Sequence, residues 1–455
     1  MRRMGKTAVL PSVFVVFFGK RWSNKGHMAE IQTQLPASIS NEPVYRRNFV
    51  YFLIDNILFA VAMGILGTTT VVPDFVRRLT DSEVLIGLSG NIFTIGFTLP
   101  QLFVARYIVG YARKKWWFVG PNIPVRFVIL LFAGLVFWLG QERVGFILLA
   151  FFICYSIAAF GDGLVGVPWA DLVGTSLDNR WRARVFGLSA AISGVIMLLI
   201  APLIGNVLGE NGPGFPNNYA VLFAASGLVF VVSILPGMMI HELPGGKVVE
   251  KLPSLAEFLP ELGGLLRDDR PFRAFIVARL LTSLLMMSAP FYIGFATVDL
   301  GLSSGVAVPV LLAMQTVGSV IGSLVYAWLG ARNNLLYMQL ALVSAALLPF
   351  CALLAGTVGV WALYAGFLLS GLAAGSNLFL SFLNWLVGYA NADQRPIYVG
   401  LSNTVTAVIS FITPFIAGTI AQQLGYQPLF AVSLVMAFCA LFVTIRFFPK
   451  MEIGD

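Results

Sequence analysis

The sequence predicts an all-α membrane protein with twelve transmembrane helices in two pseudo-symmetric halves of six. Three observations support this fold class: an apolar composition, a series of long apolar segments and an internal repeat. Of the 455 residues, 58% are hydrophobic and 11% are charged. Soluble domains are about a quarter charged residues. This chain therefore has too few charges to cover a water-facing surface of its size.

Twelve apolar segments of the length that a bilayer requires, about 20 residues, follow one another along the chain. They cover residues 48–76, 83–105, 116–139, 145–173, 184–208, 219–241, 273–298, 305–329, 335–355, 358–389, 398–423 and 427–448. The connections between them are short, except for one stretch in the middle of the chain. We expect an N-terminal tail, a first half, a central cytoplasmic loop, a second half and a C-terminal tail at 1–47, 48–241, 242–272, 273–448 and 449–455.

The basic residues indicate the orientation, because Lys and Arg are enriched in cytoplasmic loops. With the N-terminus in the cytoplasm, the outer loops receive only Arg77, Arg78 and Arg143. The inner loops then carry Arg106, Arg113, Lys114, Lys115, Arg180, Arg182, Arg184, Lys247, Lys251, Arg267, Arg270, Arg332 and Arg395. We therefore expect both termini in the cytoplasm and the protein in a bacterial cytoplasmic membrane. The net charge of +8 then reflects membrane orientation, and we expect no nucleic-acid partner.

The first 27 residues combine a basic start with an apolar run at 7–19, which is too short to cross a bilayer. No small-x-small cleavage site follows, and Met28 begins a polar stretch that leads into the first span. Two alternatives remain open: translation begins at Met28, or the apolar run is an interfacial anchor.

The central loop contains apolar residues at helical spacing, and Ser254 and Glu257 have the spacing of a capping box. This pattern favours a short amphipathic helix on the membrane surface over a solvated linker, although Pro260 weakens it.

The internal repeat joins the connection before the fifth span to the one before the eleventh. Residues 171–189 read DLVGTSLDNRWRARVFGLS, and residues 385–402 read WLVGYANADQRPIYVGLS. Both contain LVG, then Asp-x-Arg, then GLS, at offsets of 213 to 215 positions. Pro202 and Pro414 follow at nearly the same offset. The order and topological position of these matches predict two related six-span halves.

This architecture resembles the major facilitator superfamily, over about residues 45–450. Between spans 2 and 3 the chain keeps Gly110 and the basic Arg113, Lys114 and Lys115 of that family's loop motif, but no Asp accompanies Arg106. The second-half counterpart keeps Gly322, Gly330 and Arg332 and also lacks the Asp. The stretch VVPDFVRRLTDSEVLIGL resembles uncharacterised bacterial members. The resemblance implies a secondary transporter whose halves rock around a central site, with spans 1 and 7 lining the cavity and spans 2 and 11 meeting between the halves.

Four ionisable residues stand out because they lie deep within predicted spans, about 10–15 Å from the cytoplasmic ends by helical rise: Asp55, Arg126, Asp162 and Arg279. Charges at such depth are costly and commonly mark a function. Arg126 can neutralise either Asp162 or Asp55, while Asp55 and Arg279 occupy near-equivalent positions in the two halves. We expect a substrate-binding or proton-coupling site. The alternative is a static salt bridge that holds spans 1, 3 and 4 together.

Polar stripes on single helical faces predict residues that line a pathway. The candidates are Asn91, Thr94, Thr98, Gln101, Gln315, Asn377, Asn384, Asn403, Thr406 and Ser410. The alternative is ordinary hydrogen bonding between helices. Trp169 and Trp385 are candidates for a cytoplasmic gate, with interfacial anchoring as the alternative. Gly318/Gly322 and Gly371/Gly375 predict close helix contacts.

These features predict a secondary active transporter for a small organic solute, coupled to protons or another ion. A non-transporting membrane sensor or assembly factor of the same fold is the alternative. We expect no enzyme, no cofactor and no metal site, since the two histidines are far apart and the three cysteines lack a CxxC spacing. No nucleotide-binding loop is present. The expected partners are the lipid bilayer, the solute and the coupling ion, and we expect a monomer.

Overall fold

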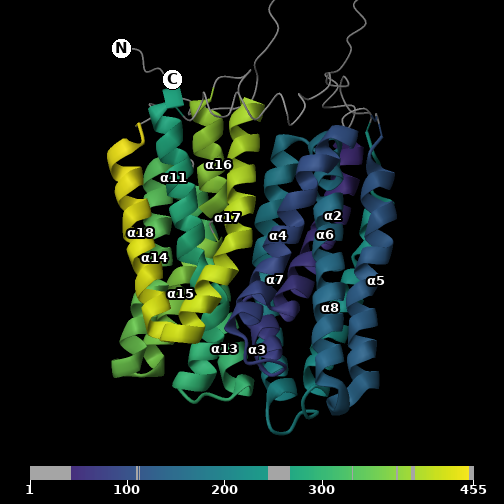
Figure 1. Ribbon diagram of the computed structural model, residues 1–455. Helices are drawn as coiled ribbons and strands as arrows, with labels where there is room; N and C mark the ends of the chain where they lie inside the picture. The colour runs from purple at the N-terminus through teal and green to yellow at the C-terminus, as the bar shows by residue number, and fades with distance from the viewer. Residues whose placement is uncertain are drawn as a thin grey trace, which may run out of the picture. The chain divides into compact units, whose positions relative to one another are not determined.

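The computed structural model describes residues 42–108, 111, 113–243, 267–329, 332–375, 378–390 and 395–449. Within these residues the chain folds into a bundle of helices (Figure 1). Eleven of the described helices are long and apolar enough to cross a membrane, and each coincides with a predicted span. The remaining predicted span, 358–389, is occupied by α15 (Val360–Gly375) and α16 (Leu378–Tyr389). The predicted fold class, with twelve transmembrane helices, is confirmed.

The helices of the first half often extend beyond the apolar segments that predict them. The first helix, for example, begins at Glu42 rather than at residue 48. The elements are α2 (Glu42–Leu66), α3 (Val71–Arg77), α4 (Glu83–Ile108), α5 (Lys115–Leu139), the 3-10 helix η1 (Gly140–Arg143), α6 (Val144–Ser176), α7 (Asn179–Leu208), α8 (Asn217–Val232) and α9 (Ile234–Met239).

Polar side chains cap the N-termini of one helix of the first half and two of the second. The side chains of Asp178, Asp269 and Asn333 cap α7, α11 and α14 by accepting a hydrogen bond from a backbone N–H three residues on. The elements are α11 (Arg270–Leu285), the 3-10 helix η2 (Met286–Phe291), α12 (Tyr292–Gly294), the π-helical η3 (Phe295–Asp299), α13 (Ser304–Leu329), α14 (Asn334–Val358), α15, α16, α17 (Arg395–Leu424) and α18 (Tyr426–Phe447).

The two halves appear as a purple-to-blue group and a green-to-yellow group of helices (Figure 1). Helices α2 to α8 contact one another within the first group, and α11 to α18 within the second. Two helix pairs, α4 with α17 and α7 with α13, make extensive contacts between the groups. The expectation that spans 2 and 11 meet between the halves is therefore confirmed.

The first and seventh spans are both interrupted. Helix α2 ends at Leu66, Gly67 turns the chain with a φ of 56°, and α3 resumes at Val71. In the seventh span, α11 gives way to the 3-10 helix η2, which contains Pro290, and then to the π-helical η3. Irregular backbone is tolerated at membrane depth only where protein buries it or it lines a cavity. These breaks at corresponding places in the two halves are therefore candidates for a functional region.

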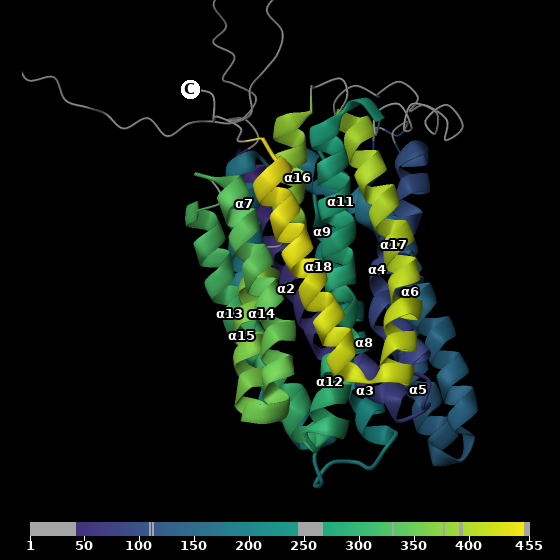
Figure 2. The same cartoon turned by 60° about the vertical axis from the view of Figure 1, so that its left-hand side comes forward.

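We call the end of the bundle that carries α3 and α12 the α3 end; Figure 2 shows it beside the junction of α17 and α18. Glycines let the halves approach closely there. A Cβ on Gly305 would come within 2.7 Å of the Cα of Gly209, and a Cβ on Gly418 would clash with the backbone of Val84. These are backbone-to-backbone approaches between the halves, across α7 with α13 and α4 with α17. The halves are thus tightly joined at the α3 end.

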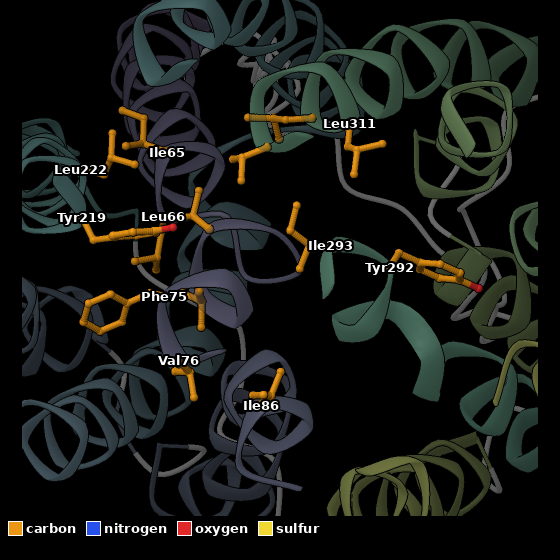
Figure 3. Packing of buried hydrophobic residues seen from close by; sticks show 14 of the residues in the cluster. Ile65, Leu66, Phe75, Val76, Ile86, Tyr219, Leu222, Tyr292, Ile293 and Leu311 are labelled. Carbon is orange, nitrogen blue, oxygen red and sulfur yellow. The ribbon is translucent and has the colours of Figure 1, made fainter. Parts of the chain in front are cut away.

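Buried aromatic side chains fix α3 against the first half. Phe75 lies with its ring centroid 5.2 Å from that of Tyr219 and 5.0 Å from that of Phe223. Figure 3 shows Phe75 and Tyr219 close to Leu66, with Tyr292 and Ile293 of the second half across from them. The Phe75 ring thus anchors α3 to α8, while α3 also contacts α4 of the first half and α12 of the second.

The predicted glycine contact lies between α13 and α15. A Cβ on Gly318 would clash with the carbonyl oxygen of Leu368, and one on Gly371 with that of Gln315. The prediction for this helix pair is confirmed. The predicted amphipathic helix at 254–266 and the segment 1–27 lie outside the described residues, as do residues 391–394 of the internal repeat.

Candidate functional site

A cavity of about 450 Å³ lies between the halves. The first half contributes Thr68 and Thr69, from the break in the first span, and residues of α4. The second half contributes residues of α11, α13 to α17 and η2, including Pro290. The cavity is therefore lined by both interrupted spans. Of the predicted pathway residues, the structure brings together Asn91, Thr94, Gln315, Thr406 and Ser410, with Arg279, around this cavity.

Sequence reasoning missed several polar residues of the same lining. These are Thr68, Thr69, Thr282, Ser283, Ser288 and Ser370, together with the aromatic Tyr292, Phe367 and Phe382. Two sequence signals could have predicted the breaks in the first and seventh spans: Gly67 in a Thr-rich stretch and Pro290 in a Ser-containing stretch. Both are helix-interrupting residues in equivalent spans.

Arg279 of α11 forms part of the cavity wall, and the residue is 8% exposed. Its Nη2 donates to the hydroxyl of Thr406 at 3.0 Å, and its guanidinium lies 5.4 Å from the centre of the Phe382 ring. Thr406 in turn donates to the carbonyl oxygen of Ser402 at 2.8 Å. The guanidinium is thus held by α16 and α17. Among the described residues that line this cavity, Arg279 is the one with a charged side chain.

The other three buried charges lie together in the first half. Arg126 of α5 and Asp162 of α6 form an ion pair, with 3.0 Å between Nη1 and Oδ1. The guanidinium also lies 4.6 Å from the centre of the Phe230 ring and 5.1 Å from that of Phe59. Of the two pairings that the sequence left open, Arg126 with Asp162 is therefore the ion pair present in this structure.

Asp55 of α2 is buried beside this pair and accepts a hydrogen bond from Trp169 Nε1 at 3.1 Å. Arg126 and Asp162 both lie within electrostatic reach of the Asp55 carboxylate. The hydroxyl of Tyr155 is buried next to Asp162 and has no hydrogen-bond partner among the described residues. A space of about 10 Å³ adjoins Arg126, Tyr155 and Asp162, roughly what one water molecule requires. We call Asp55, Arg126 and Asp162 the acidic cluster.

The structure separates some predicted residues from the central cavity. Thr98 and Gln101 lie on α4 but are not among the described lining residues, and Asn384 is exposed on α16. Asn403 lines a small pocket beside Arg279, and Asn377 lies outside the described residues.

The two candidate gate tryptophans have different surroundings. Trp169 bonds to Asp55, as described above. Trp385 is 1% exposed and stacks between Phe275 and Tyr389, with ring centroids 5.3 and 5.0 Å away. Trp385 is therefore packed in the core of the second half, and a role of either tryptophan as a gate stays a prediction.

A polar network joins the halves at the α3 end. Arg77 and Glu83 form a bidentate ion pair at 2.7 and 3.0 Å, and the Tyr426 hydroxyl donates to Glu83 Oε1 at 2.7 Å. The backbone N–H of Glu83 donates to Gln422 at 2.8 Å. We call Arg77, Glu83, Gln422 and Tyr426 the α3-end network. Sequence reasoning treated Arg77 only as an outer-loop charge, because its partners lie in distant segments.

Arg78 provides a second polar link between the halves, since its Nη2 donates to the hydroxyl of Ser304 at 2.8 Å. Asp74 of α3 is 2% exposed and accepts a hydrogen bond from the Tyr219 hydroxyl of α8. Asp74 therefore faces the interior of the protein.

Groups of acidic, histidine and cysteine residues that could hold a metal ion are absent from the described part of the chain. No protein-family model matches the chain, and no curated protein sequence is similar to it. Solved transporter structures do match. A mutant of the nucleoside transporter NupG has a TM-score of 0.67 at 12% identity, covering 88% of this chain and 100% of that one. The chain has the major facilitator fold.

Two further structures support this assignment of fold. A D-xylose-proton symporter has a TM-score of 0.67 at 12% identity, covering 90% of this chain and 98% of that one. A bacterial homologue of the iron transporter ferroportin, in an inward-facing state, has a TM-score of 0.63 at 15% identity, covering 88% and 98%. The resemblance seen in the sequence is therefore confirmed at the level of the fold, across nearly the whole length of these chains.

Proposed function

We propose that the protein is a secondary active transporter that moves a small organic solute across the membrane by alternating access. The cavity between the halves carries this proposal, because both interrupted spans and polar residues of both halves line it. Discontinuous helices in the two halves are the usual place of the substrate site in such transporters. The similar structures are by name a nucleoside transporter, a D-xylose-proton symporter and a bacterial homologue of an iron transporter, which supports transport as the function.

The structure corresponds to a state of the cycle that is closed at the α3 end. The glycine contacts and the α3-end network hold the halves together there. The expected orientation from the basic residues supports an α3 end that faces the outside of the cell. With that orientation, our proposal is that this state is inward-facing and that the solute enters the cavity from the cytoplasm.

The acidic cluster is the proposed site of proton coupling. Two carboxylates, Asp55 and Asp162, share a single guanidinium, so one negative charge is uncompensated when both are ionised. A proton neutralises this excess. A movement of α2 against α6 would change the bond between Asp55 and Trp169, and with it the affinity for that proton. The competing interpretation is a static pair that only joins α5 to α6.

Transport and coupling can be tested with purified protein in liposomes under an imposed pH gradient. We expect the gradient to drive accumulation of a solute from a panel of small organic acids, alcohols and amines. The variant Asp55→Asn should lose gradient-driven accumulation but keep exchange of solute across the membrane. Glu210→Gln, at an exposed turn after α7, is the matched control and should behave as the parent protein.

If Asp55→Asn accumulates solute as the parent does, Asp55 is not the coupling residue. If the parent binds a solute but never moves it, the alternative function, a sensor or assembly factor of this fold, is favoured instead.

A further inference from the structure

The polar lining of the central cavity has an uneven distribution of charge. Arg279 supplies a permanent positive charge at one side, and the described lining residues include no carboxylate. Asp55 and Asp162 of the first half are not part of this lining but belong to the acidic cluster, with Arg126. The described lining of the cavity therefore carries a net positive charge, at Arg279.

Several uncharged polar groups of the lining already use their donor hydrogens within their own helices. The hydroxyls of Thr282, Ser283, Ser370 and Thr406 each donate to a backbone carbonyl of their own helix, at 2.7 to 3.1 Å. The amide nitrogen of Asn91 does the same to Gly87 at 2.9 Å. A hydroxyl has one proton to donate, and its oxygen keeps lone pairs that accept. These side chains therefore offer oxygens to hydroxyl or N–H groups of a bound molecule.

The position of Arg279 suits recognition of an oxyanion. Its guanidinium is fixed by Thr406 and by the ring of Phe382. An Arg side chain carries five N–H donors in a planar fork that matches a carboxylate. A fixed fork beside a volume of about 450 Å³ can hold one end of a small molecule while the rest fills the cavity.

We propose that the transported solute is a small hydroxylated organic anion, whose carboxylate binds Arg279 and whose hydroxyl groups donate to the acceptor oxygens of α4, α11, α15 and α17. This inference rests on the proposed function and names the substrate class of that same cavity. The anion occupies a site separate from the acidic cluster, so the charge of the solute and that of the coupling proton are handled by different residues.

Equilibrium binding to the purified full-length protein tests this inference without any gradient. The probes are three matched series on the same carbon skeletons, such as gluconate, glucose and glucosamine, extended over skeletons of three to seven carbons. We expect at least one carboxylate to bind at millimolar concentration or below, and its neutral and cationic counterparts to bind at least about tenfold more weakly.

Arg279→Gln should weaken binding of that carboxylate by roughly 10- to 100-fold, the effect of losing a hydrogen bond to a charged group. Arg279→Lys should retain part of the affinity because it keeps the charge. Arg143→Gln, at the exposed last residue of η1, is the control and should bind normally. If Arg279→Gln does not fold, Thr406→Val tests the same site by removing the hydroxyl that holds the guanidinium.

The inference is overturned if a neutral or cationic probe binds as tightly as its carboxylate, or if no carboxylate binds at millimolar concentration. It is also overturned if Arg279→Gln and Thr406→Val both bind the anion as tightly as the parent protein does. Failure of the proposed function gives a different result. In that case the anion binds in an Arg279-dependent manner, but liposomes show no flux.

Discussion

Removal of the Tyr426 hydroxyl is expected to loosen the contact between the halves at the α3 end. In Tyr426→Phe the hydrogen bond to Glu83 is lost, while the ring keeps its place beside the Arg77 guanidinium, 5.4 Å from its centre. The bond joins α18 of the second half to α4 of the first. It exists only while the halves are closed at this end, so its loss destabilises the closed state selectively.

The magnitude follows from the surroundings of the network. A hydrogen bond to a charged acceptor contributes about 1.5–3 kcal/mol, and the side chains of Arg77 and Glu83 are only 14% and 13% exposed. Because solvent still reaches the network, we expect a net loss of about 1–2 kcal/mol, which shifts the equilibrium towards the opened state by a factor of about 5–30.

The assay is labelling of a cysteine introduced at Thr69, which lines the cavity, by a thiol reagent applied from the α3 side. The native exposed Cys439 is replaced by alanine, while Cys154 and Cys351 are buried. Tyr426→Phe should raise the labelling rate by the factor given above. Tyr364→Phe, a tyrosine of α15 that packs on Trp361, is the matched control. An unchanged rate in Tyr426→Phe would refute the view that the network holds this end closed.

Three further predictions concern stability and coupling. Asp162→Asn leaves the buried Arg126 without its ion-pair partner and should lower the free energy of unfolding by about 3–5 kcal/mol in thermal or denaturant unfolding; a loss below about 1 kcal/mol would contradict a buried pair. Gly318→Ala places a methyl group against the α15 backbone and should cost about 1–3 kcal/mol, whereas Gly134→Ala, which meets nothing within 4 Å, should cost nothing or stabilise α5. Trp169→Phe removes the N–H that Asp55 accepts and should change the pH dependence of transport while leaving equilibrium binding of the solute intact; an unchanged pH profile would argue against a coupling role for this bond.

The positions of the spans were predictable because hydropathy and length are local properties of the sequence. The close contact of α13 with α15 was also predictable, since Gly318 and Gly322 repeat on one helical face. The breaks in the first and seventh spans were not anticipated. Their backbone geometry depends on the packing of Gly67 and Pro290 against other helices rather than on hydropathy.

The candidate site was predictable in part. Of the polar stripe on α4, Asn91 and Thr94 line the described cavity, whereas Thr98 and Gln101 are not among its lining residues. The position of a residue on a helical face predicts the direction of its side chain. It does not predict at which level of the membrane the neighbouring helices separate to leave a cavity. For the same reason the matching depths of Asp55 and Arg279 did not predict their partners. The structure gives them Trp169 and Thr406, from different halves.

Alternating access, the central claim, is tested most directly by measuring distances between the halves at both ends of the bundle. Spin labels at Asp81 and Leu424 report on the α3 end, and labels at Arg180 and Arg332 on the opposite end; all four positions are exposed. We predict that Tyr426→Phe lengthens the first distance and shortens the second in the same fraction of molecules. Two distances that stay fixed, or that lengthen together, would contradict the account.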